Sequence, residues 1–379
     1  MNLTPEVVSL CQEVRRFIRK EVDPRSRWIE ENDAIPEELM RMAREMGLFG
    51  LTVPEPYGGI GLDLAGKCAI EEEMGRTNYG FATVIGNHTG IGTTGIVALG
   101  SEALKRKYLP RMATGEWVGC FALTEPHAGS NPADIRTTAV RKGDRYLLNG
   151  EKIYTTNGGI ARVFTVMAVT DKAKGIKGIS AFIVERGFPG FSIGRNELKM
   201  GMHGCTTAPL AFTDCEVPAE NLLGAEGAGY VQALKTLTMG RVTIAARACG
   251  MMDKLIERSV DYMKTRVQAG KKLAEFQGLQ WMLADMGVAR DASRLLTQRA
   301  IEAILRGERG TLEASAAKLY ATEALGKVVD SAVQIHGGMG YMREAGIETM
   351  YRDARISRIY EGSSEIQRNI IAAQLLKDE

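Results

Sequence analysis

The middle of the chain contains the run Val163-Phe164-Thr165-Val166-Met167-Ala168-Val169, which is rich in the β-branched and aromatic residues that favour strands. Residues 145–150 and 179–184 form similar runs. Asn-Gly and Lys-Gly turns separate these runs, and no long helical pattern lies between them. The region therefore predicts a small antiparallel β-barrel or sandwich.

Apolar residues recur at helical spacing on both sides of this region. The helical pattern runs from Thr4 to about Glu116 and returns after Gly229 in four long stretches. We therefore expect an α+β multidomain protein and no doubly wound parallel sheet. The expected parts are an N-terminal α-helical domain at 1–117, a middle β domain at 118–225 and a C-terminal four-helix bundle at 226–379.

Composition excludes several classes of protein. The 379 residues carry 48 Lys and Arg against 46 Asp and Glu, a formal charge of +2 that gives no argument for nucleic acid or membrane as partner. Six scattered cysteines form no CxxC pair, so they predict buried thiols in a reducing compartment and no metal site. The N-terminal residues show no basic flank followed by an apolar core, which a secretory signal would have, and no apolar run reaches the roughly 20 residues of a membrane span. We therefore expect a cytoplasmic location.

Residues 90–95 match the dinucleotide fingerprint G-x-G-x-x-G. That fingerprint has physical meaning only where a strand feeds the loop and a helix follows within a βαβ unit. Both flanks here are helical in pattern. We expect glycines that allow close helix packing, and no nicotinamide site.

Glu361 stands between Tyr360 and Gly362 in a segment that otherwise indicates a buried joint between helices. A carboxylate in such a place can be desolvated and directed at a substrate as a base. A Glu-Gly pair also commonly ends a helix, and the residues alone leave both interpretations open.

Five segments in one order carry a family resemblance: 123–130 (LTEPHAGS), 155–159 (TTNGG), 217–224 (VPAENLLG), 334–341 (QIHGGMGY) and 359–368 (IYEGSSEIQR). Together they resemble the acyl-CoA dehydrogenases, FAD enzymes that introduce a double bond beside a thioester. The resemblance covers nearly the whole chain. It implies an acyl-CoA substrate, bound FAD, a homotetramer built as a dimer of dimers, and an electron-transfer flavoprotein as partner.

The resemblance also implies flavin contacts in the middle domain. Leu123 and Thr124 correspond to isoalloxazine contacts, and Ser130 lies between flavin and thioester ligand. A second contact segment consists of Tyr154, Thr155 and Thr156. A simple strand exit is the alternative for residues 121–126. His127 and Asn131 depart from the family pattern, which puts the shape of the substrate entrance in question.

Further FAD contacts are implied in the C-terminal domain, several of them to the FAD of a neighbouring subunit. The planar guanidinium of an arginine can bind a pyrophosphate through two hydrogen bonds, which suits Arg266 to the FAD pyrophosphate. Alternatively, Arg266 is only an exposed charge in a loop. His336 is expected to be a packed core residue. The implied contacts are Arg266, Gln268, Gln277, Gln334, Gly337, Gly338, Ser363 and Glu365.

By the same resemblance Glu361 is the catalytic base that takes the α-proton while the β-hydride passes to the flavin. Some relatives carry the base at the position of Gly240, where this chain has no carboxylate. The residues expected at the substrate are Ser130, Thr238, Arg241, Tyr360 and Gly362. An ion pair is the alternative for Arg241.

The acyl group is less well defined. By the same resemblance, relatives that act on glutaryl-CoA hold its distal carboxylate with an arginine. Residues 80–83 contain none, which disfavours a dicarboxylic acyl group. Thr83 and Asn87 suggest a short or partly polar acyl chain, unless they only cap or back-bond within a helix. Chain length, branching and the electron acceptor stay open.

Two other functions are compatible with the same fold. One is a flavin enzyme with other chemistry, such as a monooxygenase, an oxidase or a desulfinase. The other is a flavin-retaining scaffold that binds partners. Glu361 favours the dehydrogenase, because the same-fold relatives with other flavin chemistry often lack this base.

Overall fold

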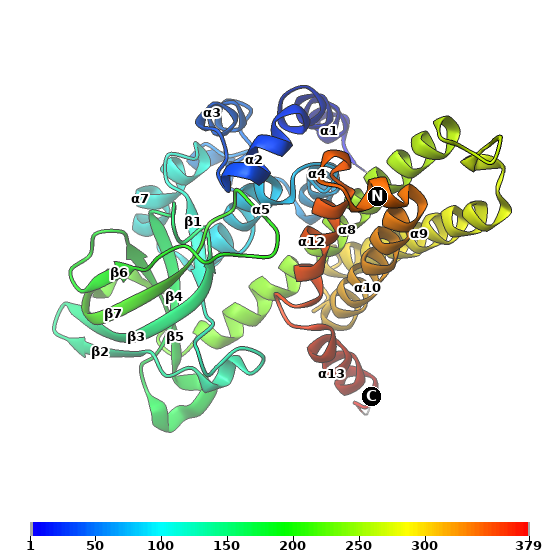
Figure 1. The fold of residues 1–379 in the computed structure, drawn as a ribbon. Coiled ribbons are helices and arrows are strands. Elements are labelled where there is room, and N and C mark those ends of the chain that lie inside the picture. Colours follow the sequence, from blue (N-terminus) through cyan, green and yellow to red (C-terminus); the bar gives the residue numbers. More distant parts are fainter. Residues whose placement is uncertain (1–2, 378–379) are drawn as a thin grey trace.

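The computed structural model describes residues 3–377, which form a helical N-terminal part, a β-sheet and a helical C-terminal part (Figure 1). The expected fold class is confirmed. Short helical turns join the N-terminal helices, which are α1 (Pro5–Phe17), α2 (Ser26–Asn32), α3 (Glu37–Glu45), α4 (Leu64–Met74), α5 (Tyr79–Asn87), α6 (Thr93–Leu99) and α7 (Glu102–Ala113).

The middle part is one eight-stranded sheet with the order β6-β7-β3-β2-β4-β5-β8, and β1 pairs with β4. Most neighbours are antiparallel as expected, but β1 and β2 both pair with β4 in parallel. The intervening strands supply the long connections that parallel strands need. The strands are β1 (Gly119–Ala122), β2 (Thr138–Lys142), β3 (Arg145–Thr156), β4 (Val163–Val169), β5 (Ile179–Glu185), β6 (Phe191–Ile193), β7 (Thr207–Pro218) and β8 (Leu222–Leu223).

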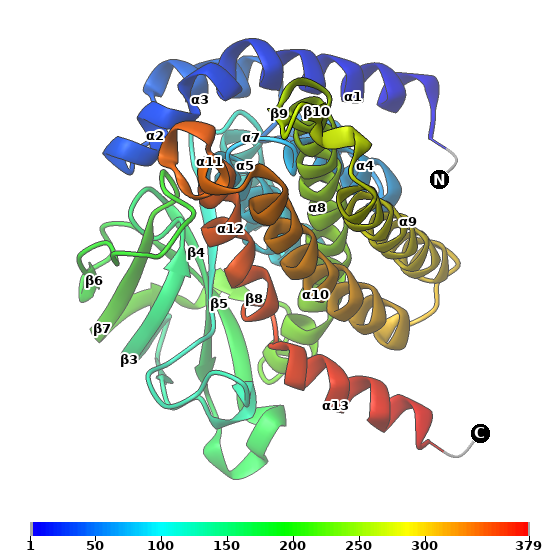
Figure 2. The ribbon, with the colours of Figure 1, turned by 45° about the vertical axis from the view of Figure 1, so that its right-hand side comes forward.

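The C-terminal part contains three long helices, α8 (Gly229–Thr265), α9 (Gln277–Leu305) and α10 (Thr311–His336), which pack on one another. The expected fourth long helix is instead divided into α11 (Gly338–Tyr341), α12 (Ile347–Arg355) and α13 (Ser364–Leu375). Both α12 and α13 pack on α10, and Figure 2 shows α13 at the lower end of the bundle. A small hairpin of β9 (Val267–Gln268) and β10 (Lys271–Lys272) joins α8 to α9.

The predicted boundaries at 117/118 and 225/226 fall between α7 and β1 and between β8 and α8. Within residues 3–377, no helix is long and apolar enough to cross a membrane. The six cysteines are free thiols, five of them buried.

The glycine run at 90–95 lies in the turn His88–Gly92 and the start of α6, and its flanks are helical as expected, although Gly90 itself has non-helical dihedral angles (φ −94°, ψ −111°). A Cβ at Gly92 would come 2.7 Å from the carbonyl oxygen of Gly119, so glycine allows this turn to lie directly on β1. His88 Nδ1 accepts a hydrogen bond from the Gly119 backbone N–H (2.9 Å). The run therefore joins helix to strand and forms no βαβ unit.

Helices α4 and α8 cross at close range through a pair of glycines. A Cβ at Gly250 would overlap the carbonyl oxygen of Glu72, and a Cβ at Gly75 would overlap that of Arg247. Backbones this close leave no room for side chains between them, and the polar groups beside the crossing are shielded from water.

A buried ion pair lies beside this crossing. Glu71 of α4 and Arg247 of α8, with 2% and 5% of their surface exposed, are joined by N···O distances of 2.5 and 2.8 Å. Lys67 lies 3.1 Å from the same carboxylate. Burial alone would raise the pKa of Glu71, but the Arg247 guanidinium and the Lys67 ammonium hold it below its usual value. The pair therefore stays charged in the interior.

We expect Gly250→Ala to destabilise the protein by about 1–3 kcal/mol or more, because the added methyl group forces α4 and α8 apart. The free energy of unfolding in urea measures this. Gly278→Ala is the matched control, because a Cβ at this exposed position of α9 meets no atom within 4 Å. Equal stability of the two variants would contradict the close crossing.

Candidate active site

Glu361 lies in the turn between the short helix Ile356–Arg358 and α13. Its φ is +52° and that of Gly362 is +94°, so two successive residues are left-handed. Such a conformation is unfavourable for a residue with a Cβ and persists only where its surroundings enforce it. Ser363 then caps α13 by accepting a hydrogen bond from the Ile366 N–H.

Side chains from three helices hold this turn by its carbonyl groups. Arg241 Nε donates to the Glu361 oxygen (3.3 Å) and Lys318 Nζ to the Gly362 oxygen (2.8 Å). Gln367 Nε2 donates to both oxygens, at 3.2 and 2.9 Å. These bonds fix the backbone of the turn, and none of them uses the Glu361 carboxylate.

The Glu361 carboxylate lies against Gly240 on α8. A Cβ at position 240 would overlap Glu361 Oε2, so only glycine leaves space for this oxygen. Oε2 is buried and has no hydrogen-bond partner within residues 3–377. A buried carboxylate oxygen without a partner is costly, and it is the strongest indication in this region of a functional group.

Burial raises the pKa of Glu361 to about 7, although the positive charges of Arg241 and Lys318 oppose the rise. Burial also lowers the pKa of the Lys318 ammonium, to about 8. A carboxylate with a pKa near neutrality binds a proton more strongly than an ordinary glutamate. Glu361 is therefore suited to remove a proton from a weak carbon acid.

Tyr360 extends from the same turn toward α5. Its hydroxyl lies 3.4 Å from the hydroxyl of Tyr79, and the Arg247 guanidinium lies over the Tyr79 ring, 5.5 Å from its centre. Arg247 Nη1 donates to Thr83 Oγ1 (3.0 Å). The turn that carries Glu361 is thus connected to the buried ion pair at the α4/α8 crossing.

This arrangement bears on one sequence-based argument. Residues 80–83 contain no arginine, but the fold brings Arg247 of α8 to Thr83. An arginine therefore lies near residues 80–83 although it comes from another helix, and the expectation about a dicarboxylic acyl group stays a prediction. Thr83 neither caps nor back-bonds, and Asn87, one turn further along α5, has a buried Oδ1 without a partner among the described residues.

The predicted flavin loop begins where β1 ends and is held by a buried lysine. Lys152 Nζ donates to the Leu123 carbonyl (3.1 Å) and to Glu125 Oε1 (2.6 Å). Glu125 also accepts from the backbone N–H groups of 136–137, and the Thr124 carbonyl accepts from β3. Burial lowers the pKa of Lys152 to about 8, an effect that Glu125 opposes. Leu123 and Thr124 are therefore rigidly placed.

The second predicted flavin segment is the end of β3. Tyr154 has a φ of +55° and is 66% exposed, so its ring is free to cover a ligand. Thr155 is buried, and its Oγ1 lacks a hydrogen-bond partner in the described part of the chain. Thr156 follows, and Asn157 Nδ2 donates to the Val84 carbonyl (2.9 Å), which ties β3 to α5. This segment has the unused polar group that a bound ligand would engage.

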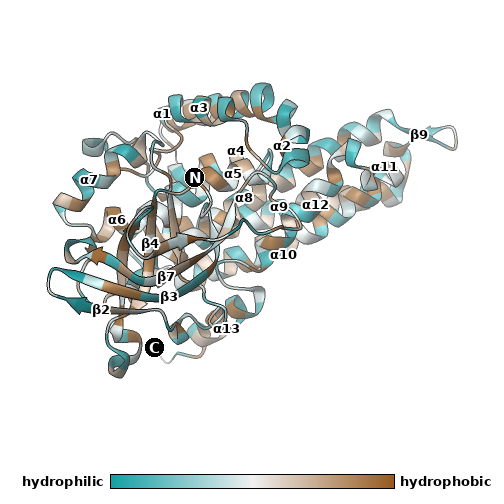
Figure 3. Cartoon of the chain, turned by 60° about the vertical axis from the view of Figure 1, so that its left-hand side comes forward, coloured by the Kyte–Doolittle hydropathy of each residue, from teal (hydrophilic) through white to brown (hydrophobic). Residues whose placement is uncertain are grey.

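Another group of predicted residues lies far from Glu361. Arg266, Gln268 and Gln277 are exposed around the β9–β10 hairpin. Arg266 follows Arg241 by 25 residues, which corresponds to about 37 Å along α8. Figure 3 shows the hairpin at the end of the bundle away from the sheet. The length of α8 therefore separates these residues from the turn that carries Glu361.

Gln334, Gly337 and Gly338 belong to that distant group. Gln334 lies in the last turn of α10 and the two glycines follow its end, where His336 stacks on Tyr262 of α8 with 4.6 Å between ring centres. His336 is buried and is a packed core residue, as predicted. A Cβ at either glycine meets nothing within 4 Å, so a ligand backbone can approach closely.

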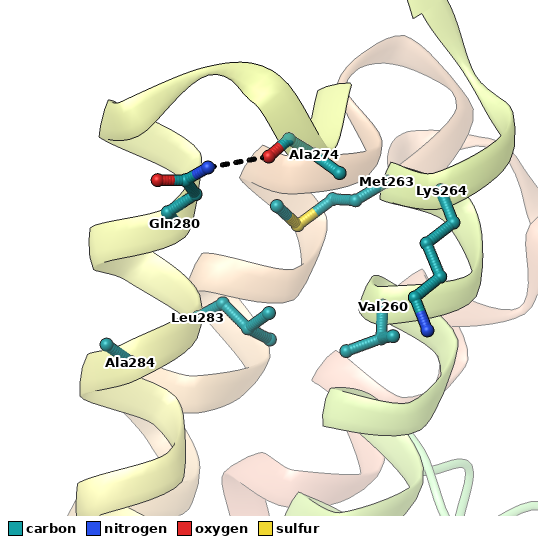
Figure 4. Close-up of a pocket in the computed structure, with 7 residues that line it drawn as sticks. All are labelled: Val260, Met263, Lys264, Ala274, Gln280, Leu283 and Ala284. Carbon is teal, nitrogen blue, oxygen red and sulfur yellow. Dashed lines mark hydrogen bonds between the residues drawn. The ribbon is translucent and has the colours of Figure 1, made fainter. Parts of the chain in front are cut away.

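A pocket of about 320 Å³ lies at this distant end, between α8 and α9 (Figure 4). Gln280 Nε2 closes one side by donating to the Ala274 carbonyl (2.7 Å). The pocket contains none of the predicted catalytic or flavin residues. Its lining is Val260, Met263, Lys264, Ala274, Gln280, Leu283 and Ala284.

The remaining predicted residues have weaker local support. Ser130 and Glu365 are exposed. Thr238 Oγ1 donates to the Leu234 carbonyl within its own helix (2.9 Å), which is the ordinary back-bond of a helical threonine. Ser363 is occupied as the cap of α13.

Sequence reasoning gave no role to Lys318, Arg247, Gln367 or Lys152. The first two had a visible signal, since each is a lone charged residue within a run of small apolar residues, Ala316-Ala317-Lys318 and Ala245-Ala246-Arg247-Ala248. Charged residues are rarely buried unless paired, so such a position indicates a specific partner. Gln367 and Lys152 had no comparable signal.

Comparison with known proteins places the chain in one family. It matches the N-terminal, middle and C-terminal domains of acyl-CoA dehydrogenases over residues 4–116, 120–215 and 227–376. An acyl-CoA dehydrogenase of Bacillus subtilis is 44% identical over 99% of both chains. Butyryl-CoA dehydrogenase from Megasphaera elsdenii has a TM-score of 0.96 at 38% identity, covering 100% of both chains.

A further solved chain comes from a study of the electron-transferring flavoprotein of Acidaminococcus fermentans and flavin-based electron bifurcation. It is 40% identical, covers 100% of both chains and has a TM-score of 0.97. Similarity at this level extends over the whole chain, including the turn that carries Glu361.

The raised pKa of Glu361 predicts a pH-dependent effect on stability. The folded chain binds a proton on the Glu361 carboxyl more tightly than the unfolded chain does. Protonation of Glu361 therefore contributes to the free energy of unfolding below pH 4.5, and this contribution is lost as the pH rises through 7. Glu361→Gln imitates the protonated form. We expect it to raise Tm by a few degrees at pH 8 and to leave Tm unchanged at pH 4.5.

The control is Glu13→Gln on the exposed side of α1, which should leave Tm unaffected at both pH values. Thermal unfolding at matched flavin content makes the comparison. A Glu361→Gln variant that is no more stable than wild type at pH 8 would show that this carboxylate is not destabilised by burial.

Proposed function

The chain belongs to the acyl-CoA dehydrogenase family, and on this basis we propose that Glu361 is the base that removes the α-proton of a bound acyl-CoA. The reaction is the FAD-dependent α,β-dehydrogenation of an acyl-CoA thioester to the trans-2-enoyl thioester. The observation that carries the proposal is the buried Oε2 of Glu361, which has no partner in the described chain.

The residues of this chain suit the proton transfer. A thioester makes the α-hydrogen weakly acidic, and a base with a pKa near 7 can accept that proton at neutral pH. Arg241 and Lys318 fix the turn through its carbonyl oxygens, so the carboxylate keeps its direction during the transfer. Tyr360, Gly362 and Ser130 are proposed to line the substrate.

The middle domain fits FAD. Thr155 presents a buried hydroxyl without a partner, and Lys152 fixes the loop that contains Leu123 and Thr124. We propose that these residues, with Tyr154 and Thr156, hold the isoalloxazine ring. When bound, FAD supplies the acceptor for the hydride that leaves the β-carbon.

Arg266, Gln268, Gln277, Gln334, Gly337 and Gly338 are proposed to bind the FAD of a neighbouring subunit. Their distance from Glu361 along α8 and α10 supports this assignment. A closed symmetric assembly, a tetramer built as a dimer of dimers, would complete every site. Ser363 and Glu365 are proposed as FAD contacts on the near side.

A stripe of apolar residues on α9 supports the assembly. Trp281, Val288 and Leu295 are 61%, 69% and 67% exposed and recur at seven-residue spacing, so they share one face of the helix. Such a face in a single chain fits contact with a second copy.

An electron-transfer flavoprotein is the proposed acceptor of the electrons, because a chain 40% identical comes from a study of such a protein. A cytoplasmic location is proposed from the free, mostly buried thiols. Reduced enzyme that reacts faster with air than with an electron-transfer flavoprotein, forming hydrogen peroxide, would favour the oxidase alternative.

Glu361→Gln tests the proposed base. The amide keeps the size of the side chain but cannot accept the proton, so FAD and acyl-CoA should still bind while flavin reduction slows by about 10⁴-fold or more. Anaerobic bleaching of the flavin by butyryl-CoA at matched flavin content measures the rate. Near-normal bleaching in the variant would identify another residue as the base.

Arg266→Ala tests the shared site. We expect weaker retention of FAD with little change in the secondary structure, because Arg266 is exposed in the single chain. Arg309→Ala, an exposed arginine in the α9–α10 loop, is the matched control and should retain FAD normally. A stable monomer with full flavin content in sedimentation would exclude a site shared between subunits.

A further inference from the structure

The buried polar cluster around Arg247 has more hydrogen-bond donors than the described chain satisfies. The guanidinium has five N–H groups. Three are used, in the bonds from Nε and Nη2 to Glu71 and from Nη1 to Thr83. Because Arg247 is almost fully buried, the two remaining N–H groups have no bulk water to bond.

The two tyrosines add a further donor. Tyr79 and Tyr360 share one hydrogen bond between their hydroxyls, in which only one hydroxyl hydrogen can be used. The other hydrogen has no acceptor in the part of the chain that the structure describes. The unused groups of this cluster are therefore donors, and a ligand that satisfies them must offer an acceptor.

The cluster lies on the substrate side of α8. Arg247 follows Gly240 by seven residues, which places both on one face of the helix and about 10 Å apart. Gly240 is where the Glu361 carboxylate rests, and the charges of Arg247 and Glu71 both influence that carboxylate. An acyl chain whose α-carbon lies at Glu361 and that extends inward along α8 would therefore run toward Arg247.

An alkyl end would be poorly accommodated there. An alkyl end would cover charged and hydroxyl groups without offering them a hydrogen bond. The buried donors would then stay unpaired, and binding would lose the free energy of their desolvation. An oxygen acceptor at the distal end would instead bond the spare N–H groups of Arg247 and the spare hydroxyl hydrogen.

We propose that Arg247, with Tyr79 and Tyr360, selects short acyl-CoA substrates whose distal end carries an oxygen hydrogen-bond acceptor. This inference rests on the proposed function and names the substrate class of the same site. A carboxylate and a hydroxyl both supply the acceptor. The two differ in that a hydroxyl can also donate a hydrogen bond, whereas a carboxylate only accepts.

Chains of equal length test the selection in the holoenzyme. Glutaryl-CoA is compared with pentanoyl-CoA, and 4-hydroxybutyryl-CoA with butyryl-CoA, by the rate constant of anaerobic flavin reduction divided by the apparent dissociation constant. We expect at least one oxygen-ended substrate to exceed its alkyl partner by about tenfold or more. The pair that shows the preference identifies carboxylate or hydroxyl.

The double variant Arg247→Gln/Glu71→Gln removes both charges together, so no unpaired buried carboxylate remains. Lys67 keeps Thr89 as a hydrogen-bond partner. We expect the ratio of rates within the pair that shows the preference to fall by about tenfold or more, whatever the change in the absolute rates. If the double variant does not fold with flavin, Arg247→Lys decides the question, because lysine lacks the fork and should also weaken the preference.

Two results overturn the inference alone: equal rates within both pairs in the wild type, or a preference that survives unchanged in the variants. Failure of every acyl-CoA to reduce the flavin overturns the proposed function and this inference with it.

Discussion

The buried pair of Arg247 and Glu71 is the interaction on which the rest of the structure depends. It forms where α4 and α8 approach through Gly75 and Gly250, and it links the N-terminal helices to the bundle. Loss of one partner would leave an uncompensated charge in the interior, which is far more costly than loss of a surface ion pair. Because Arg247 also packs on Tyr79, the crossing sets the position of Tyr360 and of the turn that follows it.

The turn at Glu361 contains two features that lower the stability of the folded chain. Its left-handed backbone and its buried carboxylate oxygen are both unfavourable, and neither improves packing. Three side chains, Arg241, Lys318 and Gln367, hold the turn by its carbonyl groups and keep this conformation. The result is a carboxylate whose pKa is raised to about 7 and whose turn is held in place, as the proposed base requires.

The single chain separates its proposed cofactor residues into two groups at opposite ends of the bundle. One group surrounds Glu361 and the ends of β1 and β3, and the other surrounds the β9–β10 hairpin and the end of α10. A rigid helix as long as α8 keeps the groups apart. In the proposed assembly a ligand that uses both groups lies between subunits, so folding of the chain and completion of the site would be separate steps.

The sequence by itself determined the order of the domains, the absence of a βαβ unit at 90–95 and the identity of Glu361 as the candidate base. The first two follow from local period and local motif, which neighbouring residues encode directly. The third follows from the family resemblance that five segments of the chain carry together. Only the tertiary structure decided that β1 pairs with β4 in parallel, that Lys318 holds the Gly362 carbonyl and that Arg247 reaches α5. Glu71 and Arg247 are 176 positions apart. Periodicity indicates which face of a helix is buried, but the partner of a buried charge depends on where the helices cross, and here the crossing is set by glycines on both of them.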